Sequence, residues 1–350
     1  MDALLWRSDR QLYILRSRII PFDKESRIAA ADGPGLFGYR LQYCSAPPCP
    51  SSPLKGTLPM PVGRECPVIK PEAVPTPYLE INEELQTLHR GACEVLGSRV
   101  VGMYLYGSLA YGDFALERSD IDFVIVTNDE VTGEAVPALE AMHARQTASG
   151  TVWAKRLEGS YISQPALRRY EPTDGMRAHI NRGNFYLGHH GSEWIIHRHV
   201  LREQGVVVAG PCPAGLIDPM PDTELRRSVL GILREWWEPI VQNPVRLRSG
   251  EYQAYAIMTM CRALYTLRHG VVATKPVSAR WARGELGEEW APLIDSALAW
   301  RHNMPLDRMS ETLDFMRFML GHCLSDERLT SSHAFPADLI VPPQVRRRPV

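Results

Sequence analysis

The pattern of hydrophobic and polar positions divides the chain into an α/β region and a helical region. In the α/β region it predicts helices over 81–97, 108–115 and 133–149 and strands over 100–106, 121–127 and 152–163. In the helical region it predicts amphipathic helices over 222–241, 251–270, 288–302 and 308–324. The predicted fold class is therefore an α/β domain, a small mixed sheet with flanking helices, followed by an all-helical C-terminal domain.

The predicted domains leave three segments without a clear period. Ten of the 28 prolines lie between Cys44 and Pro77, and proline at this density forbids regular elements. We expect residues 1–77 to form a Pro-rich, poorly structured extension, although 1–40 offers a short strand pair as an alternative. In chain order, we predict an extension 1–77, a catalytic α/β domain 78–165, an interdomain segment 166–219, a helical domain 220–327 and a disordered tail 328–350.

Charge and cysteine content narrow the class of protein. The 39 basic and 40 acidic residues give a net charge of -1, which argues against nucleic acid as a partner. No apolar run approaches the ~20 residues that a membrane span needs. The charged first 20 residues lack a secretory signal, and seven scattered cysteines without a CxxC pair favour reduced thiols. We expect a cytoplasmic protein without a membrane partner, for which a monomer is plausible.

Candidate chemistry is concentrated in MYLYGSLAYGDFALERSDIDFVIV, residues 103–126. Asp120 and Asp122 stand two positions apart at the start of a predicted strand, so their carboxylates share one face. Two adjacent carboxylates repel one another unless a cation lies between them. Mg²⁺ prefers one or two such oxygen ligands and completes its shell with water and substrate phosphates. The spacing therefore predicts a magnesium site.

A phosphate site is predicted beside these aspartates. Gly107 and Ser108 end the preceding strand and begin a helix. Glycine lets the backbone approach a ligand, and a helix N-terminus presents free N–H groups. Ser119 either adds a hydroxyl to this site or caps the turn before the strand. A phosphate site next to a metal site predicts binding of a nucleoside triphosphate.

Glu158 is the candidate for a third carboxylate. On the strand predicted over 152–163, Arg156, Glu158 and Ser160 share one face and Leu157 lies on the other. Glu158 is predicted either to join the metal site or to deprotonate an acceptor hydroxyl, since a general base must reach the proton that it removes. An ordinary surface carboxylate is the structural alternative.

These motifs resemble the nucleotidyltransferase superfamily of the DNA polymerase β type, and more narrowly the streptomycin/spectinomycin adenylyltransferases. The resemblance covers residues 78–327 and is carried by LYGS and SDID, by VAGP and LIDPMP, and by MCRALYTLRHGVVATKPVSARWA. It implies Mg²⁺ as cofactor, ATP as co-substrate and a role in antibiotic resistance. The implied residues are Asp120 and Asp122 as metal ligands, Glu158 as base, Arg262 and Lys275 as nucleotide contacts and Trp300 as an aromatic near the nucleotide.

The acceptor is less clearly indicated than the nucleotidyl chemistry. In the family, aromatic and acidic side chains bind the drug, and Trp236, Trp237, Glu238 and Glu251 offer similar chemistry without a clean match. The leading hypothesis is transfer of AMP to a small polyhydroxylated acceptor such as an aminoglycoside. A protein acceptor and a non-catalytic nucleotide-binding module are the alternatives.

Residues of the helical domain and of the interdomain segment also have structural interpretations. Read without the family, Arg262 is a helix surface charge, Lys275 a solvated lysine and Trp300 a core residue. Four histidines occur within residues 189–199, a density that invites a zinc hypothesis. No cysteine or HExxH pattern lies nearby, so packing and hydrogen bonding are the favoured interpretation of this segment.

Overall fold

The computed structural model describes residues 66–68, 74–171, 175–301 and 304–325. Most of the predicted extension 1–77 and all of the predicted tail 328–350 lie outside the described residues, so those two predictions stay open. Among the described residues near the boundary, Thr76 is buried. It forms hydrogen bonds with the side chain of Asn82 in the first helix, so this part of the predicted extension packs against that helix.

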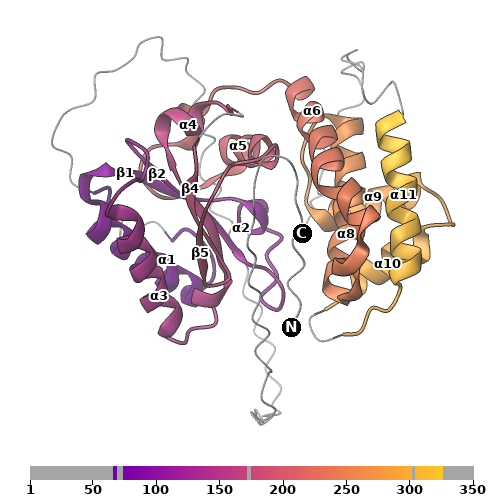
Figure 1. Ribbon diagram of the computed structural model, residues 1–350, viewed down its shortest axis with the longest axis horizontal. Helices are drawn as coiled ribbons and strands as arrows, with labels where there is room; N and C mark the ends of the chain where they lie inside the picture. Colours follow the sequence, from indigo (N-terminus) through magenta and orange to yellow (C-terminus); the bar gives the residue numbers. More distant parts are fainter. Residues whose placement is uncertain (1–65, 69–73, 172–174, 302–303, 326–350) are drawn as a thin grey trace, which may run out of the picture. The chain divides into compact units, whose positions relative to one another are not determined.

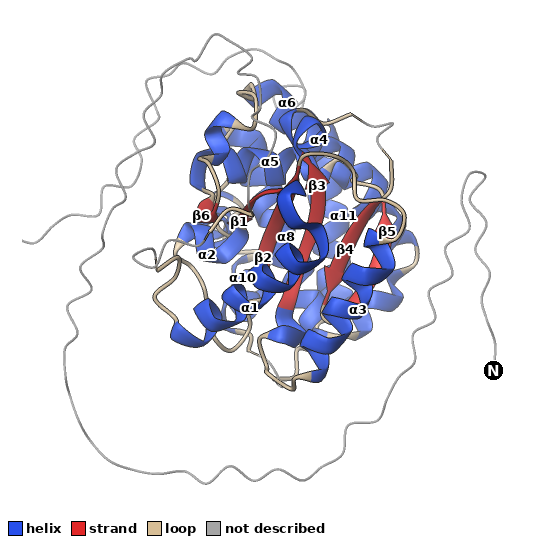
Figure 2. Ribbon diagram, turned by 90° about the vertical axis from the view of Figure 1, so that its left-hand side faces the viewer, coloured by secondary structure: helices blue, strands red, loops and turns tan. Residues whose placement is uncertain are grey.

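A six-stranded mixed sheet forms the α/β half, with strand order β5-β4-β3-β2-β1-β6. Its strands are β1 (Val100–Leu105), β2 (Ile121–Thr127), β3 (Leu157–Ser163), β4 (Arg177–Asn181), β5 (Asn184–Gly188) and β6 (Val206–Ala209). Within it β2 and β3 pair in parallel, whereas the other neighbouring strands are antiparallel. Figure 2 shows these strands in red between the helices.

Helices cover both faces of this sheet because its central strands are apolar on both sides. On one face lie α1 (Leu79–Leu96) and α3 (Ala135–Ala148), which run side by side in Figure 1 and bury Leu85, Leu88 and Leu139 with the sheet. On the other face α5 (Glu193–Gln204) contributes Trp194 and Leu201. Two short helices, α2 (Gly107–Tyr111) and α4 (Gln164–Arg168), follow β1 and β3.

The segment 166–219, which we predicted to be interdomain, supplies three of the six strands. β4 and β5 form a hairpin on the edge beside β3, and β6 pairs with β1 on the opposite edge. Each of these strands has only four or five residues. A run that short carries too few alternations to be recognised by its period, and pairing with an existing strand edge stabilises it.

The C-terminal half is helical, as predicted. Its helices are α6 (Asp222–Ile232), α7 (Glu238–Gln242), α8 (Gly250–His269), α9 (Lys275–Glu285), α10 (Ala291–Ala299) and α11 (Met309–Ser325). The single helix predicted over 222–241 is interrupted by a π-helical turn at Leu233–Trp237. Side-chain caps at Ser249 and Thr274 begin α8 and α9. The central α8 packs against its neighbours through Ile257, Met260 and Leu264, residues that lie in one buried core.

The cysteines differ from the prediction of reduced thiols. Cys66 and Cys93 form a disulfide across 27 positions of sequence, and Cys212 is disulfide-bonded as well. Cys261 and Cys323 are free and buried. A pair so far apart has no local spacing signal, which is why the sequence pattern missed it. Separately, no helix of the described chain is both long and apolar enough to cross a bilayer.

Candidate active site

The turn from β1 into α2 is built around a glycine that makes room for a carboxylate. Gly107 has φ of +62°, and a Cβ there would lie 1.9 Å from Oδ2 of Asp122. The backbone N–H of Ser108 donates a hydrogen bond to the Asp122 carboxylate, and the N–H of Tyr106 donates to the Asp122 carbonyl at 3.1 Å. Gly107 and Ser108 therefore lie directly against Asp122.

Strand register brings Asp122 and Glu158 together. In the parallel pairing of β2 with β3, Asp122 is the partner of Glu158, and each is the second residue of its strand. Partners in register point to the same face of a sheet, here the face opposite Ile121 and Leu157. Asp120 lies one residue before β2. We call Asp120, Asp122 and Glu158 the acidic cluster.

The charged form of the acidic cluster is unfavourable, because its carboxylates are close to one another and buried from water. Burial, followed by the charge of Glu158, raises the pKa of Asp122 well above its ordinary value. Burial, followed by the charge of Asp120, raises the pKa of Glu158. A raised pKa makes a carboxylate a stronger base and favours a nearby cation.

Lys275 and Arg262 bring positive charge to the cluster from the helical half. Lys275 is the first residue of α9, and its Nζ lies 4.6 Å from the centre of the Tyr255 ring. Burial and the charge of Arg262 on α8 lower the pKa of Lys275 to about 8, while Asp122, Glu158 and Asp120 oppose the shift. Lys275 is therefore near enough to the acidic cluster and to Arg262 for their charges to act on its pKa.

Arg182 is a site residue that the sequence pattern missed. It occupies the two-residue turn between β4 and β5 with φ of +49°, followed by Gly183 at +81°. Its Nη2 donates to Asp120 at 2.9 Å and to Glu251 on α8 at 3.3 Å. Positive φ at both positions is the type I′ hairpin turn, and Arg-Gly between two short strands was the available sequence signal.

Aromatic and histidine side chains surround the face of the sheet on which the cluster lies. Tyr106 packs 4.9 Å from the ring of His197. Burial, followed by Asp122 and Glu158, raises the pKa of Tyr106 well above its ordinary value. His190 stacks on Trp194 at 3.6 Å and shares a hydrogen bond of 2.9 Å with Ser160. The geometry of this His-rich segment matches the packing interpretation.

Of the other predicted residues, Ser119, Trp300 and Trp236 have structural contacts of their own, whereas Trp237 packs on a ring that contacts Lys275. Ser119 accepts a hydrogen bond from the Ala115 N–H at 3.0 Å, so it takes the turn-capping alternative. Trp300 lies in the core of the helical half and donates to the Met304 carbonyl at 3.0 Å. Trp236 is exposed beneath the guanidinium of Arg246. Buried Trp237, in contrast, packs on Tyr255, the ring that contacts Lys275.

The donor set of the acidic cluster fits a magnesium ion with two protein carboxylates. Asp120 already attracts a cation, Arg182, and Asp122 is held in a space that a Cβ on Gly107 would fill. Within the described part of the chain, only Cys66, His89 and Cys93 bring three ligand atoms within 4.8 Å of one another. Asp120 and Asp122 would therefore hold the ion together with substrate oxygens, which is the usual arrangement for Mg²⁺.

Comparison with known proteins agrees with this fold. The family Nucleotidyltransferase domain matches residues 83–155, and the family Aminoglycoside adenylyltransferase, C-terminal domain matches 215–322. The spectinomycin 9-adenylyltransferase of Staphylococcus aureus is 25% identical over 231 residues, 62% of this chain and 83% of that protein. The aminoglycoside (3'') (9) adenylyltransferase of Escherichia coli is 24% identical over 237 residues, covering 63% and 87%.

A solved structure shares the fold as well. The spectinomycin adenyltransferase of Enterococcus faecialis, solved with ATP and spectinomycin, aligns with a TM-score of 0.55 at 15% identity over 68% of this chain and 98% of that one. The mixed sheet and the two family matches make the chain similar to nucleotidyltransferases. More particularly, it is an enzyme that resembles the aminoglycoside adenylyltransferases in its catalytic and its C-terminal halves.

Proposed function

We propose that this enzyme transfers AMP from ATP to a hydroxyl group of an aminoglycoside or aminocyclitol antibiotic. The observation that carries the proposal is the pairing of Asp122 with Glu158 in register, with Lys275 near enough for both carboxylates to raise its pKa. A metal-binding aspartate, a base and a cation for phosphate then meet at one point. The relatives, one of which was solved with ATP and spectinomycin, support the choice of nucleotide and acceptor.

In the proposed reaction, Glu158 accepts the proton of the acceptor hydroxyl. The acceptor oxygen forms a bond to the α-phosphorus of ATP, the bond from that phosphorus to the bridging oxygen breaks, and pyrophosphate leaves. Lys275 and Arg262 bind the negative triphosphate. The Ser108 N–H holds the Asp122 carboxylate in place beside the turn. A Mg²⁺ ion on Asp120 and Asp122 would supply charge neutralisation at the phosphate oxygens.

The acceptor site is proposed at the junction of the β4–β5 turn with α8. Glu251 is half-exposed there and offers a carboxylate to the ammonium groups of an aminoglycoside. Trp237 is buried and packs against the Tyr255 ring. Its proposed role is to position that ring, not to touch the acceptor. Trp236 contacts Arg246 instead, and we assign it no acceptor role.

The test is incubation of the protein with labelled ATP, Mg²⁺ and a panel of aminoglycosides and aminocyclitols, followed by mass spectrometry. We expect one drug of the panel to gain one AMP. The variants Asp120→Asn and Asp122→Asn should lose this activity while keeping their circular dichroism spectrum, since each removes one charge without changing shape.

Three outcomes separate the proposal from its alternatives. Label on a protein band, with no modified drug, would indicate a protein acceptor. ATP binding without any product, across drugs and proteins, would indicate a nucleotide-binding module. Wild-type turnover in both asparagine variants at limiting Mg²⁺ would show that Asp120 and Asp122 are not the metal ligands.

A further inference from the structure

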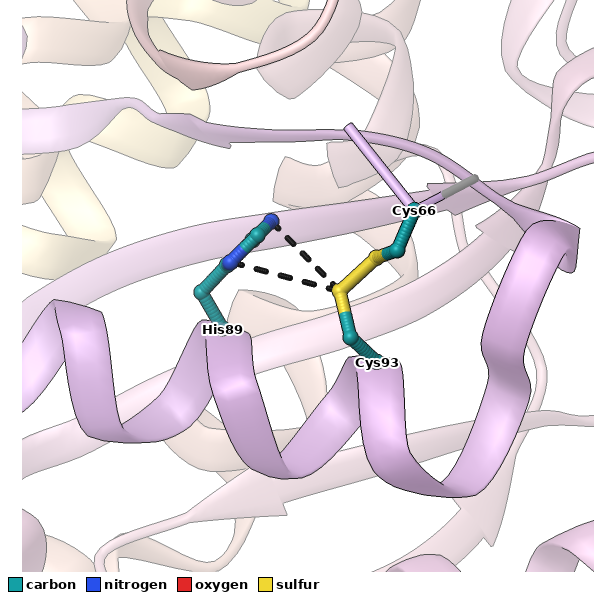
Figure 3. A group of neighbouring side chains, drawn as sticks. All are labelled: Cys66, His89 and Cys93. Atoms are coloured by element: carbon teal, nitrogen blue, oxygen red, sulfur yellow. Dashed lines mark hydrogen bonds between the residues drawn. A yellow bond between two sulfur atoms is a disulfide. The ribbon is translucent and has the colours of Figure 1, made fainter. Parts of the chain in front are cut away.

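We propose that Cys66, His89 and Cys93 form a zinc site that replaces their disulfide when the two cysteines are reduced. The three side chains lie on the α1 side of the sheet and belong to none of the groups in the acidic cluster. Figure 3 shows them: His89 and Cys93 point from successive turns of α1 toward Cys66 on the preceding segment. Nothing in the proposed AMP transfer uses them.

The geometry of the three ligand atoms suits a tetrahedral ion. Nε2 of His89 lies 3.6 Å from Sγ of Cys93, and the other ring nitrogen lies at 4.0 Å. Zn–S bonds of ~2.3 Å and Zn–N bonds of ~2.0–2.1 Å at a tetrahedral angle separate S and N by ~3.5–3.6 Å. The histidine therefore already stands at ligand spacing. Reduction needs only to let the two sulfurs separate to ~3.8 Å.

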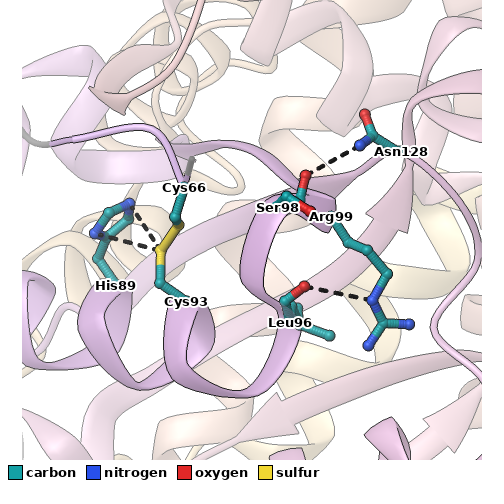
Figure 4. Close-up of a disulfide and its surroundings, with 7 residues drawn as sticks. All are labelled: Cys66, His89, Cys93, Leu96, Ser98, Arg99 and Asn128. Carbon is teal, nitrogen blue, oxygen red and sulfur yellow. Dashed lines mark hydrogen bonds between the residues drawn. A yellow bond between two sulfur atoms is a disulfide. The ribbon is translucent and has the colours of Figure 1, made fainter. Parts of the chain in front are cut away.

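Surrounding contacts fix the ligands. The His89 ring donates a hydrogen bond to the backbone of Pro67, which is the kind of partner that orients a metal-binding imidazole. Cys93 lies one turn before the end of α1, and Figure 4 shows how that end is tied to β2: Asn128 donates to the Ser98 carbonyl at 3.2 Å. Two of the three ligands therefore come from a helix that is anchored to the sheet.

The fourth coordination position of a tetrahedral ion at this site would face solvent. Cys66, His89 and Cys93 line a surface pocket of about 460 Å³, so a water molecule can complete the tetrahedron. Two thiolates neutralise the charge of a divalent ion, and sulfur with imidazole is a donor set that suits Zn²⁺ better than Mg²⁺. Magnesium at the acidic cluster and zinc at this site would therefore not compete.

The exchange is balanced as a thiol–disulfide reaction. A small dithiol reduces the Cys66–Cys93 bond, gives two thiols and becomes a cyclic disulfide itself. Each thiol then loses a proton on binding the ion, so metal binding releases two protons. The link between residues 66–68 and α1 is covalent in one state and metal-mediated in the other.

The experiment uses the full-length protein, reduced with dithiothreitol under argon, freed of the reagent and titrated with Co²⁺. We expect one equivalent of Co²⁺ to produce sulfur-to-cobalt charge-transfer absorption and the visible bands of a tetrahedral ion, and Zn²⁺ to displace it. Cys93→Ser and His89→Gln should bind Co²⁺ at least ~10-fold more weakly. The oxidised protein should show no such absorption.

Matched controls separate this site from other thiols of the reduced chain. Cys323→Ala removes a buried cysteine of the helical half, and Cys212→Ser removes a further disulfide thiol. Each should retain the cobalt spectrum. The proposal is overturned if the reduced wild type binds no Co²⁺, or if its spectrum persists unchanged in both His89→Gln and Cys93→Ser. Near-ultraviolet circular dichroism of each variant establishes that it is folded.

Discussion

Arg182 donates two hydrogen bonds to the same oxygen of Asp120, from Nε at 3.2 Å and from Nη2 at 2.9 Å. One guanidinium thus neutralises a carboxylate that we propose as a metal ligand, and it also contacts Glu251 on α8. The acidic cluster therefore already has a protein cation at its edge. A metal ion on Asp120 must share this carboxylate with Arg182 or displace it.

This relationship predicts how Arg182 affects metal binding. Replacing it in Arg182→Gln removes the competing charge, so Mn²⁺ should bind the nucleotide-free protein ~2- to 10-fold more tightly, as expected for a half-exposed charged contact. Electron paramagnetic resonance of free Mn²⁺ measures this. Arg169→Gln, which breaks an exposed pair with Asp218, is the control and should change nothing. Weaker Mn²⁺ binding in Arg182→Gln would contradict the competition.

Gly107 should be intolerant of a methyl group. In Gly107→Ala the Cβ would meet Oδ2 of Asp122 and move the carboxylate. We expect turnover to fall by about 10²-fold or more, the usual effect of a displacement of ~1 Å at a reacting centre. Gly112→Ala is a matched control, since Gly112 also has positive φ but nothing lies within 4 Å of its Cβ. It should lose about 1 kcal/mol of stability and keep its turnover.

Substitutions of Glu158 and Lys275 should affect turnover and ATP binding separately. Glu158→Gln keeps size and hydrogen bonding but cannot accept a proton, so turnover should fall ~10²–10⁴-fold with nearly unchanged ATP binding. Lys275→Ala should weaken ATP binding by about 1.5–3 kcal/mol. Titration calorimetry with a non-hydrolysable ATP analogue and single-turnover rates distinguish the two effects. If Glu158→Gln abolishes ATP binding, Glu158 belongs to the metal ligands and another group is the base.

ATP affinity should depend on pH through Lys275. Its pKa is lowered to about 8, so the ammonium is present below that pH and is lost as the pH rises through it. The Kd of an ATP analogue should therefore increase between pH 7 and pH 9, by up to about tenfold. Lys275→Arg stays charged over this range and should flatten the curve. Equal slopes for the two proteins would exclude Lys275 as the titrating contact.

Acid should destabilise the fold partly through His143. Burial lowers its pKa to about 4, and its Nε2 shares a hydrogen bond of 2.9 Å with the Tyr161 hydroxyl. The unfolded chain binds this proton near pH 6.5, so stability is complete above that value and is lost as the pH falls toward 4. Between pH 7 and pH 5 we expect His143 to account for a loss of roughly 2 kcal/mol. Urea unfolding of wild type and His143→Gln at pH 7 and pH 5 should show a smaller loss in the variant.

The parts of the fold that could be predicted from sequence are those with long, regular periods. The helix ending near Gly97 and the strands that hold Asp122 and Glu158 are long enough for their apolar positions to define a face. Alternation alone could assign Asp120 and Asp122 to one face of the first strand, and Glu158 to the face of Arg156 and Ser160 on the other. The pairing of Asp122 with Glu158 across strands, however, needed the register of β2 against β3, which no local pattern contains.

Long-range contacts are the part that sequence patterns could not predict. Arg182 became a site residue because the β4–β5 hairpin carries it to Asp120, 62 positions away. The Cys66–Cys93 bond likewise joins residues 27 positions apart, and it depends on Cys66 lying beside α1. For Trp300 the family resemblance implied a place near the nucleotide, whereas its side chain packs in the core of the helical half. Burial was decided by tertiary packing rather than by residue type.

The parallel pairing of β2 with β3 makes the spacing of the carboxylates independent of the chain that connects the two strands. The connection between them, residues 128–156, includes α3. It leaves the carboxyl end of β2 and enters the amino end of β3. Added or deleted surface residues in that crossover leave the register unchanged as long as the strands themselves pair as before. The crossover is therefore a place where an affinity tag or a reporter peptide can be inserted without moving Asp122 relative to Glu158.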